Sequence, residues 1–201
     1  MNVYDFDETV FKGDTEVYFF RYMFRLLGPF PWKLNYDFHE WISNHKLMRK
    51  TKAREMGYRL LRVVPDIDAV LEDFWDEHEK YLLDWYLKAK KPDDVIASGT
   101  PAFLMIPIVK RLGLTELIAT DMDKHTGKVN GNYVVLQEKV TEFRKKYPGQ
   151  VIDNFYSDSW TDHYLAEIAE HAFAMDEKYE KHDWNAYFDA HPEKKVVRYN
   201  L

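Results

Sequence analysis

The chain has 201 residues, of which 46% are hydrophobic and 16% aromatic, so it can bury the core of one domain with an insertion and is not intrinsically disordered. Its 34 acidic and 28 basic residues give a net charge of −6, which disfavours nucleic acid as a partner. The absence of cysteine excludes disulfides, thiolate metal sites and a cysteine nucleophile.

No targeting or membrane-spanning segment is expected. The first ten residues carry acids at positions 5, 7 and 8 and lack the basic and apolar segments of a signal peptide, so we expect a cytoplasmic protein. The longest aromatic stretch, residues 17–32, is interrupted by arginine, glycine and proline, and is shorter than the roughly 20 apolar residues that cross a bilayer.

The first predicted strand, residues 2–5, is followed by about 80 residues with helical periodicity. Four helices joined by short turns are predicted in this insertion: 14–28, 34–45, 51–64, and one long amphipathic helix from Asp66 to Pro92. Together they indicate a four-helix bundle.

The rest of the chain alternates between short apolar runs and helical segments. Strands are predicted at 94–97, 117–120, 151–156 and 172–175, and helices at 103–112, 139–146 and 163–171. This alternation predicts an α/β fold with a Rossmann-like parallel sheet. Polar residues at the carboxyl ends of its strands would then gather in one crevice.

Two pairs of aspartates follow predicted strands. Asp5 and Asp7 end the first strand, and Asp158 and Asp162 follow the fourth. If these strands are neighbours, four carboxylates meet at one edge, a charge density that is stable only around a cation. All-oxygen ligands favour Mg²⁺ over zinc. Spacing alone leaves open that all four are solvated helix caps.

Two further features suit a phosphate group. Ser98, Gly99 and Thr100 end the second strand and are expected to open the next helix, where free backbone N–H groups favour an anion. Lys139 begins the helix before the fourth strand and could add a positive charge. Each feature alone is also common on protein surfaces.

Taken in chain order, DFDET (5–9), SGT (98–100), Lys139 and SDSWTD (157–162) resemble the four motifs of the haloacid dehalogenase-like hydrolase superfamily. The helical insertion resembles the cap of its phosphoserine-phosphatase-like branch. The resemblance covers essentially the whole chain. It implies a catalytic core formed by residues 1–13 and 91–201, and a cap formed by residues 14–90.

The resemblance also implies roles for the acidic residues. Asp5 would be the nucleophile that becomes a phospho-aspartate, and Asp7 the general acid and then the base. Mg²⁺ would be held by the Asp5 carboxylate, the Asp7 backbone carbonyl and Asp158, with Thr9 and Asp162 in support.

For the phosphoryl group, the resemblance implies binding by Ser98 and the amide of Gly99, with Lys139 holding the nucleophile and the developing charge in place. Asp7 distinguishes phosphate-ester hydrolases of this family from its dehalogenases. The implied activity is therefore a Mg²⁺-dependent phosphatase acting on a phosphomonoester of a small molecule.

Some motifs depart from those of phosphoserine phosphatases. Thr161 stands where that branch has a phosphate-binding asparagine, and Thr100 and Pro101 replace Gly-Phe, which argues against phosphoserine as the substrate. Asp14 falls near the position of an acid that meets the substrate's amino group, but its surroundings do not match. The segment 121–135 reads as a hairpin-like stretch that the family places outside the site.

The sequence is also consistent with three alternatives. The chain could be a phosphotransferase, which passes the phosphoryl group to another alcohol, or a metal- or phosphate-binding relative without catalysis. It could also be a lipid-phosphate phosphatase, because aromatic residues of the insertion and the basic stretch 45–54 would suit peripheral contact with a membrane.

Overall fold

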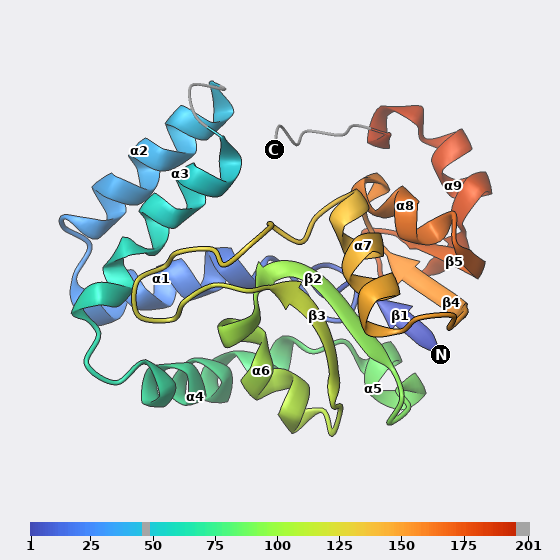
Figure 1. The fold of residues 1–201 in the computed structure, drawn as a ribbon, viewed down its shortest axis with the longest axis horizontal. Helices are drawn as coiled ribbons and strands as arrows, with labels where there is room; N and C mark the ends of the chain where they lie inside the picture. The colour runs from blue at the N-terminus through green and yellow to red at the C-terminus, as the bar shows by residue number, and fades with distance from the viewer. Residues whose placement is uncertain (46–48, 196–201) are drawn as a thin grey trace.

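A six-stranded sheet lies at the centre of the computed structural model, which describes residues 1–45 and 49–195 (Figure 1). The strands are β1 (Asn2–Tyr4), β2 (Val95–Pro101), β3 (Glu116–Thr120), β4 (Ile152–Ser157), β5 (Ala169–Met175) and β6 (Lys181–Asp183). Their order is β3-β2-β1-β4-β5-β6, and only β6 runs antiparallel to its neighbour. The predicted α/β fold with a parallel sheet is confirmed.

Helices cover both faces of the sheet, as expected for parallel strands whose two faces are both apolar (Figure 1). On one face, Tyr4 and Ile96 share a core with α6 (Ala102–Arg111), and Tyr86 of α5 (Asp84–Ala89) packs its ring 4.9 Å from that of Tyr4. On the other face, Val3 packs in a core with side chains of α7 (Gln137–Lys146), α8 (His163–Ala166) and α9 (Trp184–Ala190).

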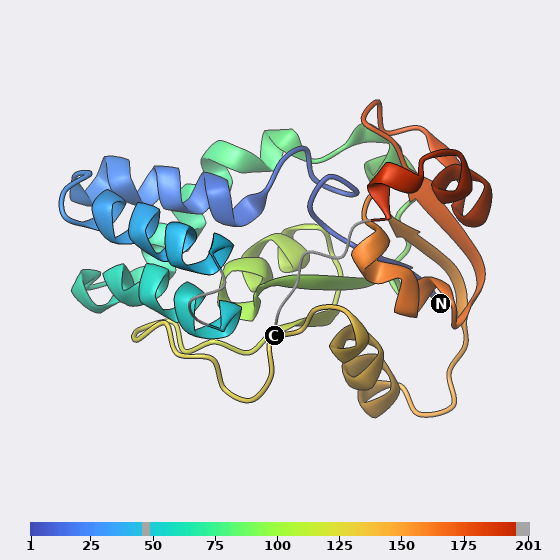
Figure 2. The same ribbon diagram turned by 90° about the horizontal axis from the view of Figure 1, so that it is seen from above.

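The insertion after β1 forms a helical arm beside the sheet (Figures 1 and 2). It contains α1 (Thr15–Leu27), α2 (Trp32–Asn44), α3 (Lys50–Gly57), a 3-10 helix (Tyr58–Val63) and α4 (Ile67–His78). The side chain of Asp14 caps α1 by accepting the N–H of Val17 at 2.9 Å, and Gly28, at a φ of +81°, ends it. The division into a core of 1–13 and 91–201 and a cap of 14–90 stays a prediction.

The prediction of one long helix from Asp66 to Pro92 is wrong. The chain leaves α4 through a 3-10 turn (Glu79–Tyr81) and is extended at Leu82 and Leu83 before α5 begins. There, the N–H of Leu83 donates to the carbonyl of Val10 at 2.9 Å, so these residues pair with the loop after β1. The helical spacing of apolar residues continues through Leu82 and Leu83 because α4 and α5 both bury aromatic side chains, so the sequence pattern does not reveal the interruption.

Two other helices end more than two residues from the predicted boundary. The helix expected over 51–64 becomes a 3-10 helix after Gly57, and the one expected over 163–171 ends at Ala166. In the second case the chain turns into β5 already at Ala169, because residues 169–171 pair with β4. The strand β6, helix α9 and the 3-10 helices Trp160–Asp162 and Pro192–Lys194 were not predicted.

The long connection from β3 to α7 runs out along the helical arm and back in both views (Figures 1 and 2). The N–H of Val129 donates to the side chain of Glu55 on α3 at 3.0 Å, and Lys124 pairs with Asp68 on α4 at 2.6 Å. A Cβ at Gly127, whose φ is +69°, would lie 2.5 Å from Tyr58, so this close approach requires glycine. The connection therefore ties the core to the arm.

The surface of the arm relates to the membrane alternative. A row of large apolar side chains on and next to α2 is exposed: Phe30, Leu34, Phe38 and Trp41. Residues 46–48 of the predicted basic stretch lie outside the described residues, so the structure does not test this alternative. No helix in residues 1–45 and 49–195 is long and apolar enough to cross a bilayer.

Candidate active site

The first and fourth predicted strands, β1 and β4, are neighbours in the sheet. This is the condition under which the two aspartate pairs were expected to meet. β1 and β4 run parallel with Tyr4 opposite Tyr156, and the N–H of Asp5 donates to the carbonyl of Tyr156 at 2.9 Å. Asp5 and Asp158 each follow directly on the last residue of their strand. Both therefore lie at the carboxyl edge of the sheet, where parallel strands present their functional residues.

Lys139 links two of these carboxylates. From the first turn of α7 its ammonium lies 2.8 Å from Asp5 Oδ1 and 2.8 Å from Asp162. All three residues are buried, and Ser157 Oγ also donates to Asp162 at 2.9 Å. Burial alone would lower the pKa of Lys139, but the charges of Asp162 and Asp5 raise it overall, so this lysine stays charged.

One lysine does not compensate the acids around it. Burial raises the pKa of Asp5 to about 6, with Asp162 adding to the rise and Lys139 opposing it. Burial, followed by the charges of Asp5 and Asp162, raises the pKa of Asp158 well above its ordinary value. A further positive charge beside these carboxylates would favour their ionised forms, and their oxygens are suitable ligands for a metal ion.

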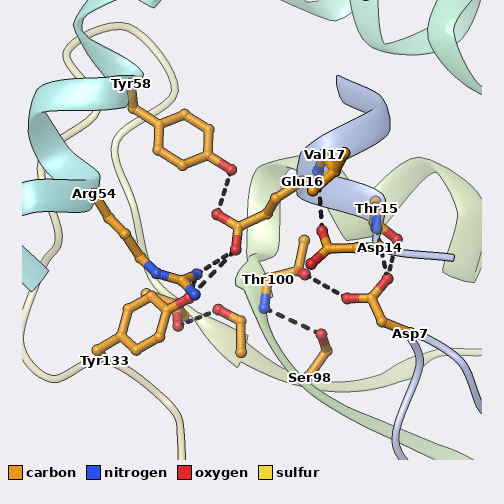
Figure 3. A network of polar contacts seen from close by, with 12 residues as sticks. Asp7, Asp14, Thr15, Glu16, Val17, Arg54, Tyr58, Ser98, Thr100 and Tyr133 are labelled. Carbon is orange, nitrogen blue, oxygen red and sulfur yellow. Dashed lines mark hydrogen bonds and ion pairs between the residues drawn. The ribbon is translucent and has the colours of Figure 1, made fainter. Parts of the chain in front are cut away.

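Asp7 is held by two threonines at the start of the arm and on β2. Its Oδ1 accepts the backbone N–H of Thr15 at 2.8 Å and also the Thr15 hydroxyl, and its Oδ2 accepts the Thr100 hydroxyl at 3.1 Å (Figure 3). Burial and the charge of Asp14 raise the pKa of Asp7 to about 8. At neutral pH this carboxyl is therefore mainly protonated and able to give up a proton.

The structure places Ser98 and Gly99 beside these acids, but not at a helix start as predicted. β2 continues to Pro101 with an irregular register after Ala97, and α6 begins only at Ala102. The N–H of Thr100 donates to the buried Ser98 Oγ at 3.1 Å. A Cβ at Gly99 would lie 2.9 Å from Val135 Cγ1, so a larger residue would displace the returning connection.

Thr9 hydrogen-bonds the backbone of the acidic cluster. It is fully buried, and its hydroxyl oxygen accepts the backbone N–H of Asp158 at 3.0 Å. Thr9 thereby joins the loop after β1 to the loop after β4, the two segments that carry the aspartate pairs.

A cavity of about 210 Å³ collects the predicted residues. Its lining includes Asp5, Asp7, Ser98, Gly99, Lys139, Asp158 and Asp162. Among the residues that the structure describes, seven acidic side chains and two basic ones line it. A larger cavity of about 660 Å³, between the 176–180 turn and α9, contains none of the predicted site residues.

The side of this cavity that faces the arm carries residues that the sequence analysis did not assign (Figure 3). Glu16 accepts hydrogen bonds from Arg54 of α3 and, at 2.7 Å, from the Tyr58 hydroxyl. The guanidinium of Arg54 lies 4.6 Å above the ring of Tyr133 and donates to its hydroxyl oxygen. The segment 121–135 therefore reaches the site, which corrects the expectation that it lies outside.

No local pattern distinguishes these residues. Arg54 is one of several basic residues in a helix with few apolar positions, and Glu16 reads as an ordinary acid in a first helical turn. Tyr133 lies in a connection without a helix or strand. Only the return of that connection along the arm brings the three together.

The comparisons with known proteins agree with this architecture. The sequence model of the haloacid dehalogenase-like hydrolases matches residues 3–167. A protein of unknown function from Bordetella pertussis Tohama I has a similar structure, with a TM-score of 0.73 and 19% identity over 99% of this chain and 98% of that one. No curated protein matches the sequence.

Two further solved structures share the fold. A probable phosphoserine phosphatase from Vibrio cholerae gives a TM-score of 0.65 and 13% identity over 98% of this chain and 60% of that one. A phosphoserine phosphohydrolase-like protein from Francisella tularensis gives 0.56 and 16% over 87% of each chain. The match to most of the chain, together with this fold, shows that the protein belongs to the haloacid dehalogenase-like hydrolase family.

Proposed function

We propose that the chain is a Mg²⁺-dependent phosphatase that hydrolyses a phosphomonoester of a small molecule through a phospho-aspartate on Asp5. The observation that carries this proposal is the buried cluster in which Lys139 contacts Asp5 and Asp162 beside Asp158. The Vibrio cholerae and Francisella tularensis proteins of similar structure are described as phosphoserine phosphatase-like, which supports a small phosphate ester as the class of substrate.

The donor set fits a magnesium ion. Asp5 and Asp158 would offer carboxylate oxygens and Asp7 its backbone carbonyl, and oxygen ligands without histidine or cysteine suit Mg²⁺. Burial raises the pKa of Asp5 despite the opposing charge of Lys139, and burial followed by the charges of Asp5 and Asp162 raises the pKa of Asp158. When bound, the ion would supply the charge that lets a carboxylate approach a phosphate dianion.

In the first step, a carboxylate oxygen of Asp5 attacks phosphorus as the bond between phosphorus and the leaving oxygen breaks. Asp7 gives its proton to that oxygen, so the alcohol leaves neutral. Lys139 stays charged and stabilises the negative charge that develops at the phosphoryl group, while Ser98 and the amide of Gly99 bind its oxygens.

In the second step, water attacks phosphorus and the bond to the Asp5 oxygen breaks. Asp7, now ionised, takes the proton of the attacking water, which restores both residues to their starting forms. The presence of nucleophile, acid, phosphate-binding residues and lysine around one cavity supports catalysis over mere binding. Transfer to another alcohol would differ only in the acceptor of this step.

Replacement of the nucleophile tests the proposal. We expect Asp5→Asn to lower phosphate release by at least about a thousandfold while the circular dichroism spectrum is unchanged. Hydroxylamine added to the wild-type enzyme during turnover should convert the acyl phosphate at Asp5 into a hydroxamate that mass spectrometry detects on the peptide containing residue 5.

A matched control uses an aspartate away from the cavity. Asp66, which caps α4 by accepting the N–H of Ala69, is replaced in Asp66→Asn, and this variant should keep full activity because asparagine also caps helices. Wild-type turnover by Asp5→Asn, or hydroxamate on a different residue, would contradict the proposal. Contact with a membrane stays a prediction, tested by co-sedimentation with anionic vesicles.

A further inference from the structure

A second, smaller cavity adjoins the catalytic one inside the arm. It encloses about 160 Å³ and shares the side chains of Asp14, Glu16 and Arg54 with the first cavity. Its other walls are mainly aromatic: Val17, Phe20, Tyr36, His39 and Tyr58. Because the three shared side chains form the boundary, the part of a substrate that extends away from the phosphoryl group meets them first.

Arg54 at this boundary forms an ion pair with Glu16. The partly buried carboxylate of Glu16 accepts from the Arg54 guanidinium and from the Tyr58 hydroxyl, and the ring of Tyr133 covers the guanidinium (Figure 3). An incoming carboxylate could reach Arg54 only by displacing Glu16 or by lying beside its like charge. Either arrangement disfavours a substrate with a free carboxylate near this position.

The boundary also has an excess of negative charge. Two carboxylates, those of Asp14 and Glu16, face one guanidinium. Burial and then the charge of Glu16 raise the pKa of Asp14, and Arg54 opposes this rise. A cation placed here would gain from both carboxylates.

The aromatic walls behind the boundary favour the same ligand. The ring of Phe20 lies 4.6 Å from that of Tyr36 and 4.8 Å from that of Tyr58, so three rings border one small space. Aromatic faces attract ammonium groups, and this attraction is strongest where water is excluded. The volume of this smaller cavity, about 160 Å³, suits a small amine and not a long chain.

We propose that Glu16 determines the specificity for the leaving group, so that the site takes phosphomonoesters of alcohols that carry a cationic amine and no carboxylate. This inference rests on the proposed phosphatase function. At the boundary between the two cavities, Glu16 neutralises Arg54 and Asp14 keeps the net charge negative. The aromatic cavity behind the boundary holds the ammonium group of the substrate.

Three phosphate esters of similar size test the proposal in the presence of Mg²⁺. Phosphoethanolamine carries an amine, hydroxyethyl phosphate is its neutral counterpart, and phosphoserine carries both an amine and a carboxylate. We expect kcat/KM of the wild-type enzyme to be higher for phosphoethanolamine than for either of the others by about tenfold or more. As a measurement independent of turnover, ethanolamine should bind to the enzyme more tightly than ethylene glycol in calorimetry.

The variant Glu16→Gln changes the charge of the boundary with little change of shape. It should lower the preference for phosphoethanolamine over hydroxyethyl phosphate and raise kcat/KM for phosphoserine by about tenfold, because the side chain at position 16 then no longer repels a carboxylate near Arg54. The matched control is Glu77→Gln. Glu77 forms an exposed ion pair with Arg25 elsewhere in the arm, so this variant should keep the wild-type order of substrates.

The outcomes separate this inference from the proposed function. The inference would be overturned if the enzyme hydrolyses hydroxyethyl phosphate or phosphoserine as well as, or better than, phosphoethanolamine. Hydrolysis of para-nitrophenyl phosphate in the same experiment would still support the phosphatase function. Failure to hydrolyse any of the four esters would overturn the proposed function itself. If Glu16→Gln does not fold, the substrate order of the wild-type enzyme and the calorimetry still decide.

Discussion

The ammonium of Lys139 lies 2.8 Å from the carboxylate of Asp5, although 134 positions of sequence separate the two residues. Asp5 directly follows the central strand β1, whereas Lys139 lies in the first turn of α7 on one face of the sheet. Both are buried, and Asp162 contacts the same ammonium. A single ammonium group therefore bridges two buried carboxylates that come from different parts of the chain.

Loss of this cation should destabilise the protein. We expect Lys139→Met to lower the free energy of unfolding by about 3–5 kcal/mol at pH 7.5, because it leaves the buried carboxylates of Asp5 and Asp162 without the positive charge that both contact. The deficit should shrink at pH 5.5, because Asp5, whose pKa burial raises to about 6, can take up a proton in the folded state. Urea denaturation at both pH values measures it. The exposed Lys145 on the same helix provides the control: Lys145→Met should change stability by less than about 0.5 kcal/mol.

The metal-free protein should become less stable as the pH rises. Asp5 and Asp7, with pKa values of about 6 and about 8, bind protons in the folded state that the unfolded state has already released. Stability that depends on these protons is complete below the ordinary aspartate pKa and is lost as the pH rises through the folded values.

Thermal unfolding in the presence of a chelator should therefore show a midpoint that falls between about pH 6 and pH 8. Added Mg²⁺ should raise the midpoint more at pH 8 than at pH 5, because ligand carboxylates must be deprotonated to bind it. A midpoint of the chelated protein that is constant or rises over this range would contradict the raised pKa values.

A hydrogen bond at the loop after β1 connects two residues in the left-handed region. Glu8 and Tyr179 have φ angles of 55° and 62°, and the Tyr179 hydroxyl donates to Glu8 Oε2 at 2.8 Å. Glu8 follows Asp7 directly, so this bond offsets the strain of the backbone next to the predicted acid.

We expect Tyr179→Phe to lower the free energy of unfolding by about 0.5–1.5 kcal/mol, as for the loss of one hydrogen bond. Glu8→Gly removes both the acceptor and the backbone strain, so Tyr179→Phe should cost little in that background. Urea denaturation of the wild type, both single variants and the double variant measures the coupling. Equal costs of Tyr179→Phe in the two backgrounds would show that the bond does not stabilise the loop.

The parts of the site that the sequence predicts are those fixed by strand topology. Asp5 and Asp158 could be placed together because parallel strands present their carboxyl ends at one edge, and β1 and β4 are neighbours. The helix from Asp66 to Pro92 could not be divided correctly, because the break at Leu82 and Leu83 arises from pairing with residues far away in sequence.

The side of the site that faces the arm also depends on contacts between residues far apart in sequence, which the sequence does not predict. Glu16, Arg54 and Tyr133 meet only because the connection from β3 to α7 returns along the arm, and no short motif reports such a path. Ser98 and Gly99 show an intermediate case. Their place near the acids follows from the position of β2, but the delayed start of α6 depends on an irregularity in its pairing with β3.

The proposed acid, Asp7, should show its role through the leaving group. Its pKa of about 8 keeps it mainly protonated at neutral pH, and Thr15 and Thr100 fix the carboxyl group. We expect Asp7→Asn to lower kcat/KM for an alkyl phosphate by about 10²–10⁴-fold, because an alkoxide cannot leave without a proton. In the wild type, kcat/KM for this substrate should decrease as the pH rises through about 8.

Para-nitrophenyl phosphate separates the two steps, because nitrophenolate leaves without a proton. Asp7→Asn should release about one equivalent of nitrophenolate in a rapid burst and then turn over slowly, since the variant still forms the phospho-aspartate but lacks the base that activates water. Stopped-flow absorbance measures the burst. The control is Asp183→Asn, which changes the residue that caps α9 by accepting the N–H of Ala186 and should behave as wild type. Equal losses for alkyl and aryl phosphates, without a burst, would contradict Asp7 as the acid, because a defect in binding or in folding does not distinguish leaving groups.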